Sequence, residues 1–228
     1  MTHPGLIAAS WLIARKDLAI EFRTRSAFLS ALILSLLAIV IFYFAWDPTA
    51  IGAADLAPGV LWVTFTFSGL LAMHRSFGVE RQDGAIEALL TAPIPREAIF
   101  LGKAFANLLF VLGVQAIALP AVAIFYNLPV GHALAPLAVV MVLAAIGLVS
   151  VGTLLGGLTA NTRLGELLLP VLALPFFVPV VMPAAQVTAH LLAGRPIAEA
   201  FAWIRILLAF DLVFVYLCTL VFPLTLDD

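Results

Sequence analysis

The side chains of this sequence that could do chemistry are few, and they interrupt long apolar runs. Asp211 stands in the run LLAFDLVFVY, and Asn107 and Gln115 stand in another run that begins near residue 98. If such runs cross a membrane, a carboxyl group inside one is a candidate functional residue, and amides are suited to hydrogen bonds between helices. Four alternatives are open for Asp211: a structural role, a pair with Arg205, a pair with another subunit, or a protonated and hydrogen-bonded state.

The sequence patterns of nucleotide and metal sites are missing. Gly102 and Lys103 have no glycine five residues before them, so the chain has no phosphate-binding loop. None of the four histidines stands in a C-x-x-C-H pattern, and the single cysteine, Cys218, lies in an apolar run. We therefore expect no catalytic residue, no metal and no cofactor in this chain, and any ATP must bind to another polypeptide.

Composition places these residues in a membrane protein. The chain is 64% hydrophobic and 11% charged with a mean hydropathy of +1.18, whereas soluble domains are about 45–50% apolar and about 25% charged. A net charge of −2 argues against a nucleic-acid partner. A spanning helix needs about 20 apolar residues, and we expect one all-α membrane domain, residues 1–228, with spans at 26–46, 58–77, 98–126, 133–159, 165–192 and 200–222.

The first residues and the distribution of positive charge predict how the chain lies in the membrane. Residues 5–24 are expected to form an amphipathic helix in the membrane interface, or alternatively a plain extension of the first span. Nine Lys and Arg residues fall on one side of the predicted spans, and only Arg195 and Arg205 fall on the other. Because cytoplasmic loops carry an excess of Lys and Arg, we expect both termini in the cytoplasm.

The predicted fifth span is interrupted by Pro170, Pro175, Pro179 and Pro183. Each proline removes one backbone hydrogen bond and frees a carbonyl, which is costly where it faces lipid. We expect a regular span that ends near residue 178, followed by short segments near the outer surface. The alternative is a single kinked helix buried in a bundle.

A glycine pattern in the predicted fourth span indicates close helix packing. Gly152 and Gly156 form a G-x-x-x-G motif, and Gly147 precedes them by about one and a half turns. Small residues at this spacing let two membrane helices approach closely. The pattern is common in membrane chains, so we expect packing and no chemistry from it.

The only sizeable polar segment is RSFGVERQDGAIEALLTAPIPREAIFLGK, residues 75–103. The spacing predicts a short helix over residues 80–90 that Pro93 and Pro95 terminate. Its apolar face would carry Ile86, Leu89 and Leu90, and its charged flank would carry Glu80, Asp83 and Glu87. Such a helix suits insertion into a groove of a cytoplasmic partner, and the alternative is a solvated helix lying against lipid headgroups.

The stretch RSFGVERQDGAIEALLTAPIPREAIFLGKAFANLLF resembles the B subunit family of cytochrome c maturation, CcmB. The stretch APGVLWVTFTFSGLLAMHRSF at 57–77, the RKDL…E…R pattern at 15–25 and LLPVLALPFFVP at 168–179 are similar to the same family, in the same order. The resemblance implies a permease subunit of an ATP-binding-cassette (ABC) complex. It also implies an ABC-2-type exporter fold in a bacterial inner membrane.

The resemblance further implies a set of partners. These are a dimeric ATPase of the CcmA type, a haem-handling membrane protein of the CcmC type, a small membrane protein of the CcmD type and a haem chaperone of the CcmE type. The ATPase subunit would dock on the 80–90 segment, and haem is expected on a partner. Two alternatives stay open: the permease of another ABC-2 exporter, for a lipid, drug or glycan, and a scaffold that assembles the complex without a translocation path.

Overall fold

The structure is a computed structural model that describes residues 5–82, 92, 94–128, 130–160 and 165–226. These described residues form helices and connecting turns, without a strand. The elements, in chain order, are α1 (Leu6–Thr24), α2 (Ser26–Ala45), α3 (Ala53–Gln82), α5 (Arg96–Phe125), η1 (Val130–His132), α6 (Leu134–Ala160), α7 (Gly165–Leu192), η2 (Ile197–Ala200), α8 (Phe201–Val221) and η3 (Phe222–Leu226).

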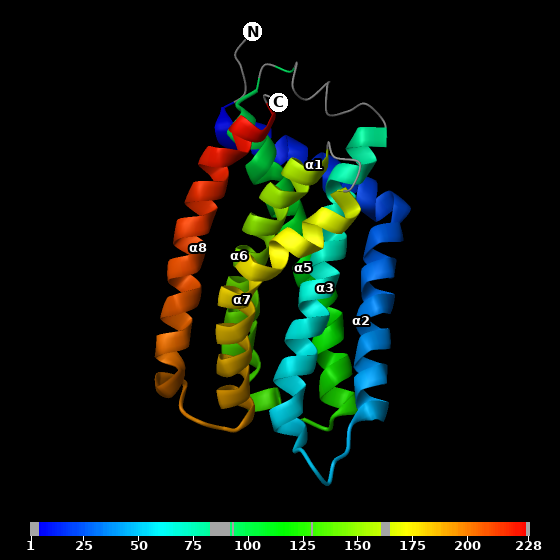
Figure 1. The fold of residues 1–228 in the computed structure, drawn as a ribbon, viewed down its shortest axis with the longest axis vertical. Helices are drawn as coiled ribbons and strands as arrows, with labels where there is room; N and C mark the ends of the chain where they lie inside the picture. The colour runs from blue at the N-terminus through cyan, green and yellow to red at the C-terminus, as the bar shows by residue number, and fades with distance from the viewer. Residues whose placement is uncertain (1–4, 83–91, 93, 129, 161–164, 227–228) are drawn as a thin grey trace.

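Six of these helices are long and apolar enough to cross a membrane, as the hydropathy pattern predicts. They stand side by side as a bundle, and α1 crosses one end of it, transverse to the other helices (Figure 1). We call this end of the bundle the α1 end. The end of α3, the beginning of α5 and the last turns of the chain also lie there, whereas the turns at 46–52 and 193–196 lie at the opposite end.

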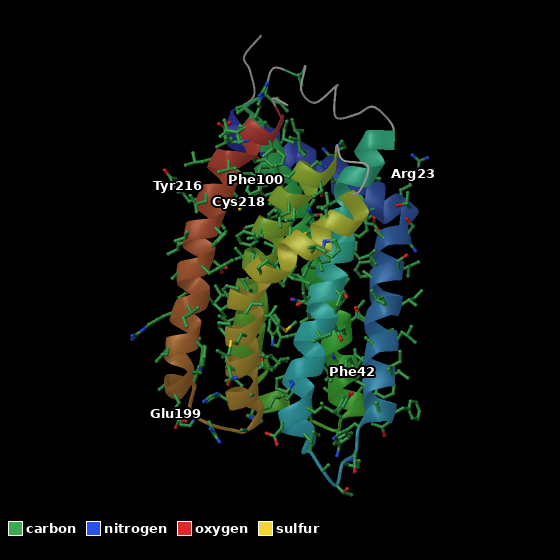
Figure 2. All side chains as sticks on the ribbon, viewed as in Figure 1. Arg23, Phe42, Phe100, Glu199, Tyr216 and Cys218 are labelled. Atoms are coloured by element: carbon green, nitrogen blue, oxygen red, sulfur yellow. The ribbon has the colours of Figure 1, made fainter. Side chains whose placement is uncertain are left out.

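The helices differ in how much of their surface the chain itself buries. In α3, 72% of the most apolar window is buried, whereas in α2 and in α8 only 22% is buried. Side chains such as Tyr216 point outward from α8 (Figure 2). Because apolar side chains this exposed would be unfavourable in water, the outer faces of α2 and α8 are surfaces for lipid or for another membrane helix.

Polar contacts inside the core tie the central helix α3 to its neighbours. The indole Nε1 of Trp62 donates a hydrogen bond to Oγ1 of Thr188 on α7, with a donor–acceptor distance of 3.0 Å. Ser35 of α2 and Ser68 of α3 share a hydrogen bond between their hydroxyl groups. Interhelical bonds of this kind stabilise membrane bundles because hydrocarbon offers polar groups no other partner.

The turn at the opposite end is ordered by local polar contacts and aromatic rings. Thr49 donates hydrogen bonds to Asp47 from its hydroxyl and from its backbone N–H. These bonds hold the pKa of the Asp47 carboxyl below its ordinary value. The ring of Trp46 lies 5.5 Å from that of Tyr126, centroid to centroid, and its Nε1 donates to the carbonyl of Ile51. Trp and Tyr are enriched where a membrane meets water.

The expected break in the fifth span is wrong. Residues from Gly165 to Leu192 form one helix, α7, with all four prolines inside it. The helix is bent instead. Its first part runs obliquely across the bundle, and its second part runs along the bundle axis (Figure 1). One face of α7, with residues spaced three or four apart, is buried along both parts of the helix: Leu169, Ala173, Phe177, Val180, Ala184, Val187 and Leu191.

Packing explains why the prolines bend α7 without dividing it. Pro175 and Pro179 lie on the exposed face of the helix, opposite the buried stripe. The hydrogen bonds that these two prolines remove are therefore on that face. Pro170 is half-buried and Pro183 is buried, so the packed side of the helix loses a bond at Pro183 as well. Prolines are a usual cause of kinks in long helices. The structure thus has a single kinked helix, as in the alternative from the sequence, but only 33% of its most apolar window is buried.

Candidate functional site

The segment predicted to dock a cytoplasmic partner begins inside α3. Glu80 belongs to the last turns of α3, which continues to Gln82, so it does not start a separate helix. The remaining predicted docking residues, Asp83, Ile86, Glu87, Leu89 and Leu90, lie outside the described residues. The described residues resume at Ala92 and Ile94, and α5 begins at Arg96 directly after Pro95. Both flanks of the segment therefore lie at the α1 end (Figure 1).

The first turns of α5 hold α1 through a close contact at Gly102. A Cβ atom built on Gly102 would lie 2.6 Å from the backbone oxygen of Ser10 and 2.7 Å from Cβ of Ile13. Only glycine leaves room for α1 to approach α5 this closely. On α1, Ile13 and Ala14 are buried, while Ile7 and Trp11 are exposed. One face of α1 thus packs on the bundle and the other is free for a membrane surface or a partner.

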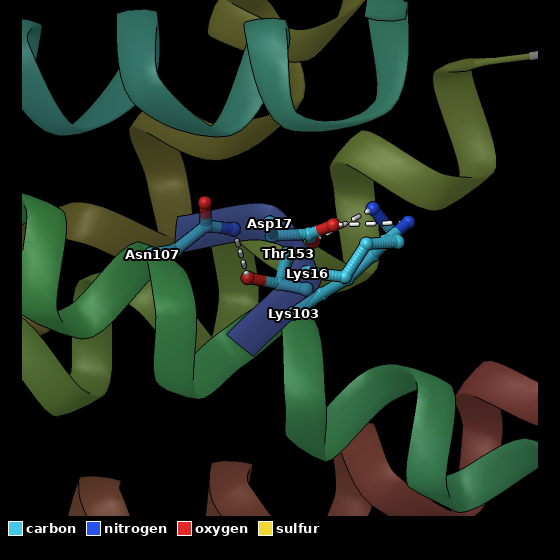
Figure 3. A network of polar contacts seen from close by, with 5 residues as sticks. All are labelled: Lys16, Asp17, Lys103, Asn107 and Thr153. Carbon is cyan, nitrogen blue, oxygen red and sulfur yellow. Dashed lines mark hydrogen bonds and ion pairs between the residues drawn. The ribbon is translucent and has the colours of Figure 1, made fainter. Parts of the chain in front are cut away.

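An ion pair next to Gly102 fixes the same contact (Figure 3). The Nζ atom of Lys103 lies 3.3 Å from Oδ2 of Asp17, and the Nζ atom of Lys16 lies 3.0 Å from Oδ1 of Asp17. The side chain of Lys103 is 1% exposed, whereas that of Lys16 is 38% exposed. A buried ammonium group is tolerated only with an anionic partner and good hydrogen bonds. The pair between α5 and α1 is therefore a strong constraint on where α1 lies.

Removing the carboxylate of this pair should harm the protein more than removing the ammonium group. We expect Asp17→Ala to cost about 3–5 kcal/mol of stability because it leaves Lys103 buried without this carboxylate. Lys103→Met should cost less, since it removes the charge and keeps an apolar chain of similar length. The control Lys16→Met, at an exposed pair, should cost about 1 kcal/mol or less. Thermal unfolding of the purified variants checks the order, and a larger loss in Lys103→Met than in Asp17→Ala would contradict it.

Glu21 joins α1 to α2. Its Oε1 atom accepts a hydrogen bond from the backbone N–H of Phe28, in the first turn of α2, at 2.7 Å. A carboxylate at this place satisfies an N–H group that the helix leaves unpaired, and it complements the helix dipole. Arg25, between the two helices, has a left-handed backbone with φ of 54°. The corner between α1 and α2 is thus fixed by a side chain and a tight turn.

The polar residues predicted inside the third span have different surroundings. Asn107 lies one turn beyond Lys103 on α5, and its Nδ2 atom donates to Oγ1 of Thr153 on α6 at 3.1 Å (Figure 3). Gln115, two turns further along, is buried, and neither atom of its amide has a hydrogen-bond partner among the described residues. The polar contacts of Lys103 and Asn107 with neighbouring helices are therefore not continued at Gln115.

The predicted glycine pattern on α6 faces two different neighbours. Gly152 packs against Met73 of α3 so closely that a Cβ atom would overlap its sulfur. Gly147 faces α7 and α8, where a Cβ atom would lie 2.8 Å from Oδ1 of Asp211 and 3.0 Å from Cγ2 of Val180. Gly156 is buried. The structure thus places Asp211, the candidate carboxyl group, at the junction of α6, α7 and α8.

Among the described residues, no three His, Cys, Asp or Glu side chains are grouped as metal ligands would be. The one thiol, Cys218, is buried beside the rings of a small apolar cluster that includes Phe100 and Phe222. Two features stand out among the described residues. One is the contact between α1 and α5 at Gly102, Lys103 and Asp17, which we call the joint, and the other is the buried carboxyl group of Asp211.

Sequence reasoning missed the residues of the joint. Gly102 and Lys103 entered only as an incomplete nucleotide motif, and Asp17 and Glu21 were not singled out. A lysine and an acidic residue that interrupt otherwise apolar stripes on two helices are a usable signal, because buried charges are normally paired. That signal names Lys103 and its possible partners on α1, although it cannot choose between Asp17 and Glu21.

The fold defines a multi-pass helical membrane protein. The family model described as "CcmB protein" matches residues 8–227. The chain belongs to this family, as the resemblance of its polar segment indicated.

Curated relatives extend the comparison over most of the chain. Heme exporter protein B of Rhodobacter capsulatus is 32% identical over 171 residues, which cover 75% of this chain and 78% of the relative. Heme exporter protein B of Paracoccus denitrificans is 31% identical over 179 residues, with 78% and 82% covered. Heme exporter protein B of Pseudomonas aeruginosa is 26% identical over 201 residues, with 88% and 90% covered.

Proposed function

We propose that this chain is the membrane permease subunit of an ABC complex that uses ATP to deliver haem for cytochrome c maturation. The observation that carries the proposal is the family match across residues 8–227, together with relatives named heme exporter protein B. The site of this subunit is a bacterial inner membrane, with both termini and the α1 end in the cytoplasm. The chain itself performs no catalysis, and the sequence pattern of a phosphate-binding loop is missing from it.

Coupling to the ATPase runs through the polar segment between α3 and α5. The partner, a dimeric ATPase of the CcmA type, takes residues 80–90 into a groove and moves them when ATP binds. The contacts at Gly102 and at the Lys103–Asp17 pair support this route, because they connect the first turns of α5 firmly to α1. Glu21 then links α1 to α2. A displacement of the segment is thereby shared by α3, α5, α1 and α2.

Haem is held by other subunits of the complex in this proposal. A CcmC-type membrane protein handles the haem, a CcmD-type protein assists it, and a CcmE-type chaperone carries it away on the outer face. The role of this subunit is then to transmit the ATP-driven movement that releases the loaded chaperone.

Purification of the intact complex tests the proposal and separates it from its rivals. The chain, tagged and extracted in a mild detergent from its own host, should bring down an ATPase and a haem-containing membrane protein. An ATPase without any haem-handling subunit would favour an exporter of a lipid, drug or glycan. A complex that assembles and turns over ATP, but in which no variant of this chain affects chaperone release, would favour a passive scaffold.

Thiol labelling tests the proposed orientation, which rests on the nine-to-two distribution of Lys and Arg. In a Cys218→Ala background, cysteines at Gly52 and Gly131 should react with an impermeant reagent added to cells whose outer membrane has been made permeable. Both positions are exposed at the opposite end of the bundle. A cysteine at Ala8, exposed on α1, should react only after the inner membrane is opened. Labelling of the Ala8 position in intact spheroplasts would reverse the orientation.

A further inference from the structure

Asp211 lies halfway along α8, in the interior of the bundle. The residue is 6% exposed. Its Oδ1 atom faces the backbone of Gly147 on α6, at the place where Val180 of α7 and Phe210 of α8 also come close. The ring of Phe210 stacks on that of Phe214, with centroids 4.1 Å apart. The carboxyl group is therefore enclosed by apolar side chains and by the backbone of one glycine.

Neither carboxyl oxygen of Asp211 has a hydrogen-bond partner among the described residues. The neighbouring helices offer little charge, because α6 has no ionisable residue and α7 has only Glu166 and His190, near its two ends. On α8 itself, Arg205 is six residues away and exposed. Of the other elements that touch α8, α5 carries Arg96, Glu97 and Lys103 in its first turns and η2 carries Glu199.

The surroundings of Asp211 decide which form of the carboxyl group fits there. An ionised carboxylate without a partner in hydrocarbon is among the most costly groups that a fold can contain, whereas the neutral acid costs far less. The packing leaves space for the carboxyl group at a glycine, because a side chain at Gly147 would collide with Oδ1.

We propose that Asp211 is a proton-binding site at the junction of α6, α7 and α8. In the packing described here the site is occupied: the carboxylate has taken one proton from water, an O–H bond exists at one oxygen, and the net charge of the group is zero. The proton can return to water only when the contact between Gly147 and Asp211 opens. The proposal does not rest on the proposed function, since it follows from burial and packing alone.

Infrared difference spectroscopy tests the occupancy of this site directly. Spectra of the wild-type protein and of Asp211→Asn, purified in detergent at pH 7, should differ by the carbonyl stretch of a neutral carboxylic acid. The matched control Asp47→Asn, at an exposed carboxyl group outside the bundle, should differ from wild type only by carboxylate bands. Carboxylate bands in the Asp211 difference spectrum would overturn the proposal. Asp211→Leu gives the same comparison if the asparagine variant does not fold.

A second pair of variants tests the role of the glycine contact. Gly147→Ala places a Cβ atom 2.8 Å from Oδ1, so it should open the junction and replace the neutral-acid band of Asp211 by carboxylate bands. Gly59→Ala is the matched control, because Gly59 is exposed on α3 and a Cβ there meets nothing within 4 Å. An unchanged neutral-acid band in Gly147→Ala would show that the contact does not retain the proton, and would overturn that part of the proposal.

Discussion

A chain carrying Ile86→Ala and Leu89→Ala should insert into the membrane at its normal level but should purify without its ATPase. Burying an aliphatic side chain contributes about 1.5–3 kcal/mol, and a charge pair at the rim of an interface contributes about 1 kcal/mol or less. If both aliphatic side chains anchor the docking segment, their loss weakens ATPase binding by at least about 100-fold. The single variant Glu87→Gln should retain the ATPase.

The double variant is read against a matched control at the other end of the bundle. Ile51 and Leu134 are each about half exposed there, at 50% and 52%, so Ile51→Ala with Leu134→Ala removes the same two side-chain types. The control should keep the ATPase at the wild-type ratio of subunits. Quantitative mass spectrometry of the purified complex gives that ratio. A wild-type ratio in Ile86→Ala with Leu89→Ala would show that the ATPase docks elsewhere.

Gly102→Ala should release α1 from the bundle while the membrane spans stay in place. The new Cβ atom would collide with the backbone of α1 at Ser10, and backbone atoms cannot move aside as the end of a side chain can. Overpacking of this kind costs about 1–3 kcal/mol. Because the proposed coupling route passes through this contact, ATP-driven activity of the complex should fall even though the ATPase still binds.

Thiol reactivity measures the release of α1. A cysteine in place of Ala14, which is fully buried on the packed face of α1, should be unreactive in a Cys218→Ala background and should become reactive when Gly102→Ala is added. Gly59→Ala is again the control, since a Cβ there meets nothing within 4 Å. An unreactive thiol in the Gly102→Ala chain would mean that α1 tolerates the collision. The contact between α1 and α5 would then contribute less to the proposed coupling between the ATPase and the membrane helices.

The sequence predicted the spans well because the length of an apolar run decides whether a helix can cross a membrane. The predicted first and sixth spans, 26–46 and 200–222, differ from α2 and α8 by one residue at each end or less. The second span was predicted too short, since α3 runs from Ala53 to Gln82. Its extra turns contain charged residues that hydropathy excludes, although they are good helix formers.

The contacts between helices could not be predicted from the sequence, because hydropathy does not indicate which helix faces pack together. Proline chemistry predicts a lost hydrogen bond in α7, but whether the helix breaks or bends depends on where its buried stripe lies, and the stripe is set by α3, α6 and α8. The pairing of Lys103 with Asp17 likewise depends on the angle at which α1 crosses α5. Gly102 sets that contact, and a lone glycine in an apolar run gives no sign of it.

The level of c-type cytochromes in the host of this protein tests the central claim most directly. Deletion of the chain should abolish cytochromes with covalently bound haem, detected by haem staining of denaturing gels, and should leave b-type cytochromes at their normal level. Reintroduction of the wild-type chain should restore the c-type signal. Normal c-type cytochromes in the deletion strain would contradict the proposal that this subunit serves haem delivery.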